Sequence, residues 1–115
     1  MSILGSADRL SAALAHLGLT IDQRAETGDV DSSWTAKLLS KGTEACAAKA
    51  EEEAGEFIQA LRGESDERVA SEAADMLYHA LVALRVRGVS LDDVAAALEK
   101  RQGTSGITEK AGRKS

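Results

Sequence analysis

Two segments of the sequence share one pattern, an apolar stripe at helical spacing with two acidic residues on one flank of the stripe. The segments are residues 49–61 and 69–84, and the acids in each are three residues apart. They are Glu53 and Glu56 in the first segment, and Glu72 and Asp75 in the second. Both segments are therefore expected to form amphipathic helices.

The connection between these segments is short enough to require an antiparallel hairpin. Gly63 is expected to end the first helix in the left-handed conformation, and Ser65 or Asp66 is expected to cap the second helix. When two such helices meet through their apolar stripes, flanks of the same rotational sense lie on the same side of the pair. The pattern thus predicts one groove that contains all four acids.

Within this groove, Glu53 is expected level with Asp75, and Glu56 level with Glu72. Four carboxylates within a few ångströms repel one another, and burial of a bare charge costs on the order of several kcal/mol. A cation relieves this cost. Because hard divalent ions prefer oxygen ligands, Mg²⁺ is the expected cofactor.

Composition favours an all-α chain. The 115 residues include no proline and only 3% aromatic residues, so the core must be aliphatic, which suits helix packing better than a sheet sandwich. We expect one domain over residues 1–115, with a flexible tail from about residue 103. A thin helical layer of this size often completes its core by oligomerising, so we expect the hairpin to become a four-helix-type bundle by dimerisation.

Charge and cysteine content exclude several classes of protein. The formal net charge of −5 argues against nucleic acid as a partner, because such proteins usually carry a basic face. Cys46 is the single cysteine and cannot form an internal disulfide. Apolar runs fall short of the roughly 18 residues of a membrane span, and the first residues are too few for a signal peptide. A cytoplasmic protein is expected.

The segments outside the two acidic helices are expected to form three further helices and one connection. Residues 7–17 read as a short helix ended by Gly18, residues 18–32 as an extended connection, and residues 33–41 as a helix of about two turns. Trp34 is expected to be a core residue at the start of that helix rather than a base-stacking platform. Thr43 is expected to cap the long acidic helix. Ser90 and Asp93 form a capping box for a last helix that begins at Leu91.

The chain also places bases near the predicted groove. Lys37 and Lys41 share one helix face, which is either a solvated basic face or a phosphate clamp directed at the groove. Lys49 lies on the flank of the acids and is expected level with His79 across the hairpin. His79 lies four residues after Asp75, so its imidazole can contact that carboxylate or donate to a phosphate.

Glu52 is turned further from the apolar stripe than its neighbours. It is close enough to hydrogen-bond a water beside a metal, or it is a solvated surface acid. Acids in the middle of the groove and bases at one end suit a metal whose phosphate ligand reaches towards the cations.

These residues resemble the all-α nucleotide pyrophosphatase superfamily, whose pattern is EExxE followed by ExxD. The pattern stands here as Glu52, Glu53, Glu56, Glu72 and Asp75. Within that superfamily the chain most resembles the phosphoribosyl-ATP pyrophosphohydrolases. The matching blocks are SWTAKLL, KAEEEAGE, SEAADMLYHALV, RGVSLDDV, LEKR and GTSGITEKAGRK. One departure is Glu51, where the family often has glycine.

The resemblance implies Mg²⁺-dependent hydrolysis of phosphoribosyl-ATP to phosphoribosyl-AMP and pyrophosphate by a helical homodimer, in the second step of histidine biosynthesis. The expected metal ligands are Glu53, Glu56, Glu72 and Asp75, and the attacking water is held by the metal or oriented by Glu52. The expected phosphate-binding residues are Lys37, Lys41, Lys49 and His79. Two alternatives remain: a pyrophosphatase of ordinary nucleoside triphosphates, and a non-catalytic dimerisation module with solvated acids.

Overall fold

The computed structural model describes residues 3–5 and 7–102, and these form helices without a strand. The helices are α1 (Ala7–Thr27), α2 (Trp34–Ser40), α3 (Thr43–Gly63), α4 (Asp66–Arg87) and α5 (Leu91–Lys100). The predicted all-α class is confirmed. The predicted tail lies outside the described residues. No helix in the described part is long and apolar enough to cross a membrane.

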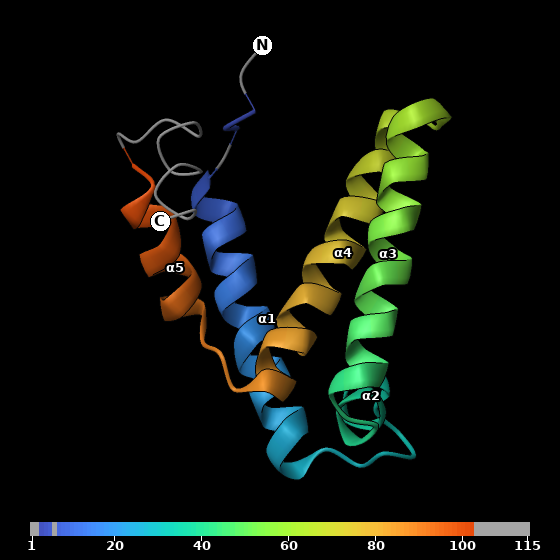
Figure 1. The fold of residues 1–115 in the computed structure, drawn as a ribbon, viewed down its shortest axis with the longest axis vertical. Helices are drawn as coiled ribbons and strands as arrows, with labels where there is room; N and C mark the ends of the chain where they lie inside the picture. Colours follow the sequence, from blue (N-terminus) through green and yellow to red (C-terminus); the bar gives the residue numbers. More distant parts are fainter. Residues whose placement is uncertain (1–2, 6, 103–115) are drawn as a thin grey trace, which may run out of the picture.

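The centre of the fold is the antiparallel pair of α3 and α4, which run side by side in Figure 1. Ser65 caps α4, because its side chain accepts a hydrogen bond from the Arg68 backbone N–H at 3.2 Å. The prediction for Gly63 was wrong, since this last residue of α3 does not adopt a positive φ. The chain instead becomes extended at Glu64 and leads directly into the Ser65 cap.

The start of α3 also differs from the prediction. Thr43 is the first residue of the helix rather than its cap. The capping position belongs to Gly42, whose φ of 90° lies in the region that favours glycine, and which makes no side-chain cap hydrogen bond. This backbone conformation reverses the chain between α2 and α3.

The prediction of a connection over residues 18–32 was wrong for residues 18–27, because α1 passes through Gly18 and continues to Thr27, and the connection to α2 begins at Gly28. A glycine inside a helix costs only about 1 kcal/mol relative to alanine. Burial of Ile21, which is 2% exposed, offsets that cost. The hydroxyls of Thr20 and Thr27 donate to backbone carbonyls four residues earlier, at 3.1 and 2.9 Å, so they need no partner outside the helix.

The buried apolar core is small and lies where α1, α2 and the hairpin meet. Its cluster consists of Ile21, Leu38, Cys46, Leu81 and Val82. Tyr78 packs against this cluster, and its hydroxyl shares a hydrogen bond with Thr35 of α2. Tyr78 is thus partly buried against another helix of the same chain.

The hairpin does not meet through the predicted apolar stripes. The buried residues of α3 are Cys46, Glu53 and Ala60, whereas Ile58 and Leu61 are exposed. The helix is rotated so that part of its acidic flank faces α4. This rotation leaves part of the apolar stripe without cover in one chain.

The last helix lies beside α1, on the side away from α3 (Figure 1). Gly88 ends α4 with a φ of 81°, and the predicted capping box of Ser90 and Asp93 is present. All side chains of α5 remain at least partly accessible in the described structure. The radius of gyration is 16.1 Å, against about 13 Å for a globular chain of this length. The single chain is therefore open.

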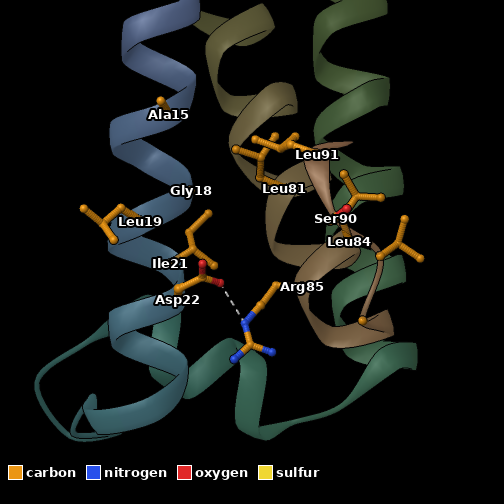
Figure 2. A pocket seen from close by; sticks show the side chains of 12 residues that line it. Ala15, Gly18, Leu19, Ile21, Asp22, Leu81, Leu84, Arg85, Ser90 and Leu91 are labelled. Atoms are coloured by element: carbon orange, nitrogen blue, oxygen red, sulfur yellow. Dashed lines mark ion pairs between the residues drawn. The ribbon is translucent and has the colours of Figure 1, made fainter. Parts of the chain in front are cut away.

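A largely apolar pocket of about 530 Å³ lies between α1, the end of α4 and the start of α5. Its lining includes Leu19 and Ile21 of α1 and Leu81 and Leu84 of α4, and Figure 2 shows Ile21 on the side of α1 that faces Leu81, with Leu19 on the other side. An ion pair between the α1 residue Asp22 and the α4 residue Arg85, at 2.9 Å, adds a polar link between these helices. The acids of the predicted groove do not line this pocket.

Substitution of Gly28, directly after α1, is expected to separate α1 from α2. A Cβ atom there would lie 2.4 Å from the Arg24 carbonyl oxygen and 2.8 Å from Ala36 Cβ. We expect Gly28→Ala to lower the free energy of unfolding by about 1–3 kcal/mol. Urea denaturation followed by circular dichroism measures the change.

Gly63 supplies the matched control, because a Cβ there meets nothing within 4 Å. Gly63→Ala should leave the free energy of unfolding unchanged or slightly raised. Equal stability of the two variants would contradict the close contact at Gly28.

Candidate active site

Five carboxylates from α3 and α4 form one acidic cluster. Its members are Glu52, Glu53, Glu56, Glu72 and Asp75. Ligand oxygens of the first three lie within 4.8 Å of one another, as do those of the last two together with Glu53. Glu53 joins the two groups, so the structure brings together all the acids that the sequence predicted in one groove. Their roles as ligands stay a prediction.

Two members of the acidic cluster are buried. Glu53 is 7% exposed and Glu72 is 3% exposed. The Oε2 atom of each is buried and has no hydrogen-bond partner among the described residues. An ionised oxygen in that position loses its hydration without replacement, which is costly. The orphaned oxygens and the all-oxygen donor set fit a hard divalent cation such as Mg²⁺.

Each helix carries a base four residues before its buried acid. On α3, Lys49 Nζ lies 3.5 Å from Glu53 and 3.4 Å from Glu52. On α4, Arg68 pairs with Glu72 at 2.6 Å and with Glu64 at 3.2 Å. The sequence interpretation missed Arg68, although the spacing of four residues to an acid on either side is a signal for it.

These contacts keep both bases charged. Burial lowers the pKa of Lys49, but the charges and hydrogen bonds of Glu52 and Glu53 raise it by more. The pKa of Arg68 is raised, first by its hydrogen bond with Glu64 and then by the charge of Glu72. Each buried acid thus has one permanent cationic neighbour, and one oxygen of each carboxylate has no partner within residues 3–5 and 7–102.

Trp34 was predicted to be a core residue, and this was wrong, because its side chain is 49% exposed. On α2 the buried positions are Ala36 and Leu38. At roughly 100° per residue, Trp34, Lys37 and Lys41 lie within about 60° of one another on one face of α2, and Leu38 lies at the border of that face. The ammonium groups of Lys41 and Lys49 lie 5.9 and 6.0 Å from the centre of the Trp34 ring.

A second pocket of about 530 Å³ lies against this face of α2, and we call it the tryptophan pocket. Its lining includes Trp34, Lys37 and Lys41, together with Asp31 of the preceding loop. Lys49 is the link from this pocket to the acidic cluster, because it contacts both the Trp34 ring and the carboxylates.

His79 lies inside the hairpin and is 7% exposed. Its Nδ1 atom lies 2.9 Å from the backbone carbonyl oxygen of Asp75, so the predicted contact with the Asp75 carboxylate is replaced by one with the main chain. Because a carbonyl only accepts, Nδ1 carries the hydrogen. The Nε2 atom is buried with no partner in the described structure, and a phosphate-binding role for His79 stays a prediction.

Repulsion within the acidic cluster is visible at Glu56. Its pKa is raised from 4.5, first by the charge of Glu53 and a hydrogen bond with it, then by burial and by Glu72. The native state therefore holds this proton more tightly than the unfolded chain does. The stabilising contribution is complete below pH 4.5 and is lost as the pH rises through the native pKa.

Replacement of Glu56 by glutamine should therefore stabilise the metal-free protein at neutral pH. Thermal unfolding in EDTA between pH 4 and 8 measures the effect, and the gain of Glu56→Gln over the wild type should grow with pH. The exposed Glu26 of α1 provides a control, since Glu26→Gln removes a charge outside the cluster. A Glu56→Gln variant less stable than the wild type at pH 7 would contradict the repulsion.

The sequence of this chain is similar to those of known proteins. The family described as phosphoribosyl-ATP pyrophosphohydrolase matches residues 14–102. A phosphoribosyl-ATP pyrophosphatase of Cereibacter sphaeroides (strain ATCC 17029) is 58% identical over 101 residues, covering 87% of this chain and 96% of the relative. The corresponding protein of Jannaschia sp. (strain CCS1) is 56% identical, with 87% and 97% covered, and that of Rhodobacter capsulatus is 52% identical, with 88% and 97% covered. The predicted resemblance is confirmed, and the chain belongs to the phosphoribosyl-ATP pyrophosphohydrolase family.

Proposed function

We propose that the acidic cluster hydrolyses phosphoribosyl-ATP to phosphoribosyl-AMP and pyrophosphate with the help of Mg²⁺. This is the second step of histidine biosynthesis. The names of the family and of its curated members support the reaction. The observation that carries the site is the pair of buried carboxylate oxygens, on Glu53 and Glu72, that have no partner among the described residues.

The residues that would hold Mg²⁺ are Glu53, Glu56, Glu72 and Asp75. When bound, the ion neutralises the phosphate charge that develops as the α–β phosphoanhydride bond breaks. Because both α3 and α4 supply carboxylates, the geometry of the site depends on how the two helices are aligned along their axes. The substitution of one ligand by its amide therefore leaves the other carboxylates in place. The cluster then carries one negative charge fewer and offers the ion one ligand fewer.

Glu52 is the candidate to orient the attacking water. Its side chain is exposed and belongs to the acidic cluster, and its contact with Lys49 is a long one of 3.4 Å. The carboxylate thus retains the capacity to accept a hydrogen bond from a water beside the scissile phosphate. The water contributes the new P–O bond, and the pyrophosphate group departs.

Phosphate oxygens would be held by the bases around the cluster. Lys49 lies at the border between the acids and the tryptophan pocket, while Lys37 and Lys41 line that pocket. A bound phosphate would draw Lys49 away from Glu53, because it offers a more highly charged partner. His79 would assist in its doubly protonated form, in which Nδ1–H donates to the Asp75 carbonyl and Nε2–H donates to a phosphate oxygen.

A homodimer forms part of the same proposal. Ile58 and Leu61 of α3 are exposed, and all of α5 remains accessible in one chain. A second copy that covers the α3 stripe would complete a four-helix bundle. The free Cys46 fits a reducing cytoplasm, and the net charge of −5 gives no basis for binding nucleic acid.

Loss of one ligand should abolish the activity and leave the fold intact. We expect Glu53→Gln or Asp75→Asn to reduce pyrophosphate release from phosphoribosyl-ATP by about 100-fold or more, since several kcal/mol of charge stabilisation is lost. Circular dichroism should remain that of the wild type.

The matched control is Glu67→Gln, which neutralises an exposed acid of α4 outside the cluster. Added Mg²⁺ should raise the unfolding temperature of the wild type and of this control, but not of Asp75→Asn, because only binding to the native state stabilises it. Normal turnover by both ligand variants would refute the proposed site.

The dimer can be tested by sedimentation. The wild-type chain of 12.0 kDa should sediment as two copies, and Ile58→Glu should shift it towards the monomer because a charge is placed in the interface. Gln59→Glu is the control, since this exposed neighbour projects to another side of α3. A wild type that sediments as a monomer at every concentration would contradict the dimer.

A further inference from the structure

The tryptophan pocket combines a flat aromatic surface with positive charge. Trp34 is half exposed, in a chain that contains one tryptophan and only 3% aromatic residues. Lys37 and Lys41 line the same pocket, and the Asp31 carboxylate lies with them. Aromatic rings stack on purines, ammonium groups bind phosphate, and a carboxylate accepts hydrogen bonds from ribose hydroxyls.

The position of this pocket relative to the acidic cluster is fixed by Lys49. Its ammonium group lies 6.0 Å from the centre of the Trp34 ring and 3.5 Å from Glu53. A ligand that extends from the acids past Lys49 therefore reaches the indole ring next. The ammonium group of Lys41 lies 5.9 Å from the same ring centre, within the range of a cation–π contact.

The substrate of the proposed function has a matching order of groups. A triphosphate leads through a ribose to a purine, and the purine carries a second ribose with its own phosphate. With the triphosphate on the acidic cluster, the purine falls beyond Lys49 and the second phosphate beyond the purine. On the protein, Lys49 lies between the acids and the Trp34 ring, and Lys41 lies as close to that ring as Lys49 does. Lys37 lines the same pocket.

We infer that Trp34 is the platform on which the adenine of the substrate stacks, and that Lys37 and Lys41 hold the phosphate of the phosphoribosyl group. This inference rests on the proposed function and adds the recognition of the base to it. Trp34 binds the substrate without touching the bond that breaks. The tryptophan pocket is thus the part of the site that distinguishes phosphoribosyl-ATP from other triphosphates.

Trp34 itself reports on binding, because a single tryptophan gives all the indole fluorescence of the chain. In EDTA, where hydrolysis does not interfere, AMP and phosphoribosyl-AMP should quench this fluorescence to saturation. Ribose 5-phosphate, which has no base, should not. Lys37→Gln and Lys41→Gln should weaken quenching by phosphoribosyl-AMP. Absence of quenching by both nucleotides up to millimolar concentration would overturn the inference.

Steady-state kinetics provide the second test. Trp34→Leu should raise the KM for phosphoribosyl-ATP about 10- to 100-fold, the effect of losing one stacked base, with kcat little changed. Trp34→Phe should restore most of the affinity. If the ring serves only to position Lys49, kcat falls instead of KM, and the inference is wrong.

The two proposals fail in different ways. A wild-type protein that releases no pyrophosphate from phosphoribosyl-ATP would refute the proposed function, whatever the fluorescence shows. Normal release by the wild type, with an unchanged KM in Trp34→Leu, would refute the stacking alone. Circular dichroism of Trp34→Leu should match that of the wild type, because the ring is half exposed.

Discussion

The structure depends on the enclosure of acidic side chains between two antiparallel helices. Glu53 and Glu72 are buried on the facing sides of α3 and α4, where an apolar pair would pack more easily. Lys49 and Arg68 each lie four residues before the buried acid of the same helix. Because the helices are antiparallel, these bases lie towards opposite ends of the cluster. Lys49 and Arg68 thus neutralise the two buried acids in part, and one oxygen of each acid has no hydrogen-bond partner in the part of the chain that the structure describes.

The orientation of the acids determines which apolar residues of α3 are exposed and where the core lies. With its acidic flank turned inward, α3 exposes Ile58 and Leu61, and the core is confined to the region where α1 and α2 meet the hairpin. The contact of Tyr78 with Thr35 joins α4 to α2 within this region. The same short helix presents Trp34 on its outer face. The surface proposed to bind the base and the helices that carry the acidic cluster are therefore joined through one core.

Much of the fold and most of the acidic cluster could be predicted from the sequence. Acids three residues apart beside an apolar stripe indicated both helices, and the caps at Ser65 and Ser90 were found because a side-chain cap is a local interaction. Gly18 misled the prediction of α1, since burial of Ile21 is a tertiary effect that overrides a local preference.

The rotation of α3 could not be predicted for a related reason. The apolar periodicity of α3 alone predicts that its apolar stripe faces α4. The inward turn of Glu53 becomes visible only when α3 is packed against α4 in the structure. Trp34 was misplaced because a bulky ring is usually buried. In α2 it is Ala36 and Leu38 that reach the core. The sequence of a helix of two turns is too short to show which of its faces is buried.

The buried positions of α3 recur every seven residues, at Cys46, Glu53 and Ala60. This is the repeat of a coiled-coil seam, in which a leucine at the middle position would interlock with the facing helix. An aliphatic residue at position 53 would therefore pack better against α4 and raise the stability of the hairpin, but it would remove one carboxylate from the cluster. At Glu53 a buried carboxylate therefore stands where an aliphatic side chain would pack more tightly.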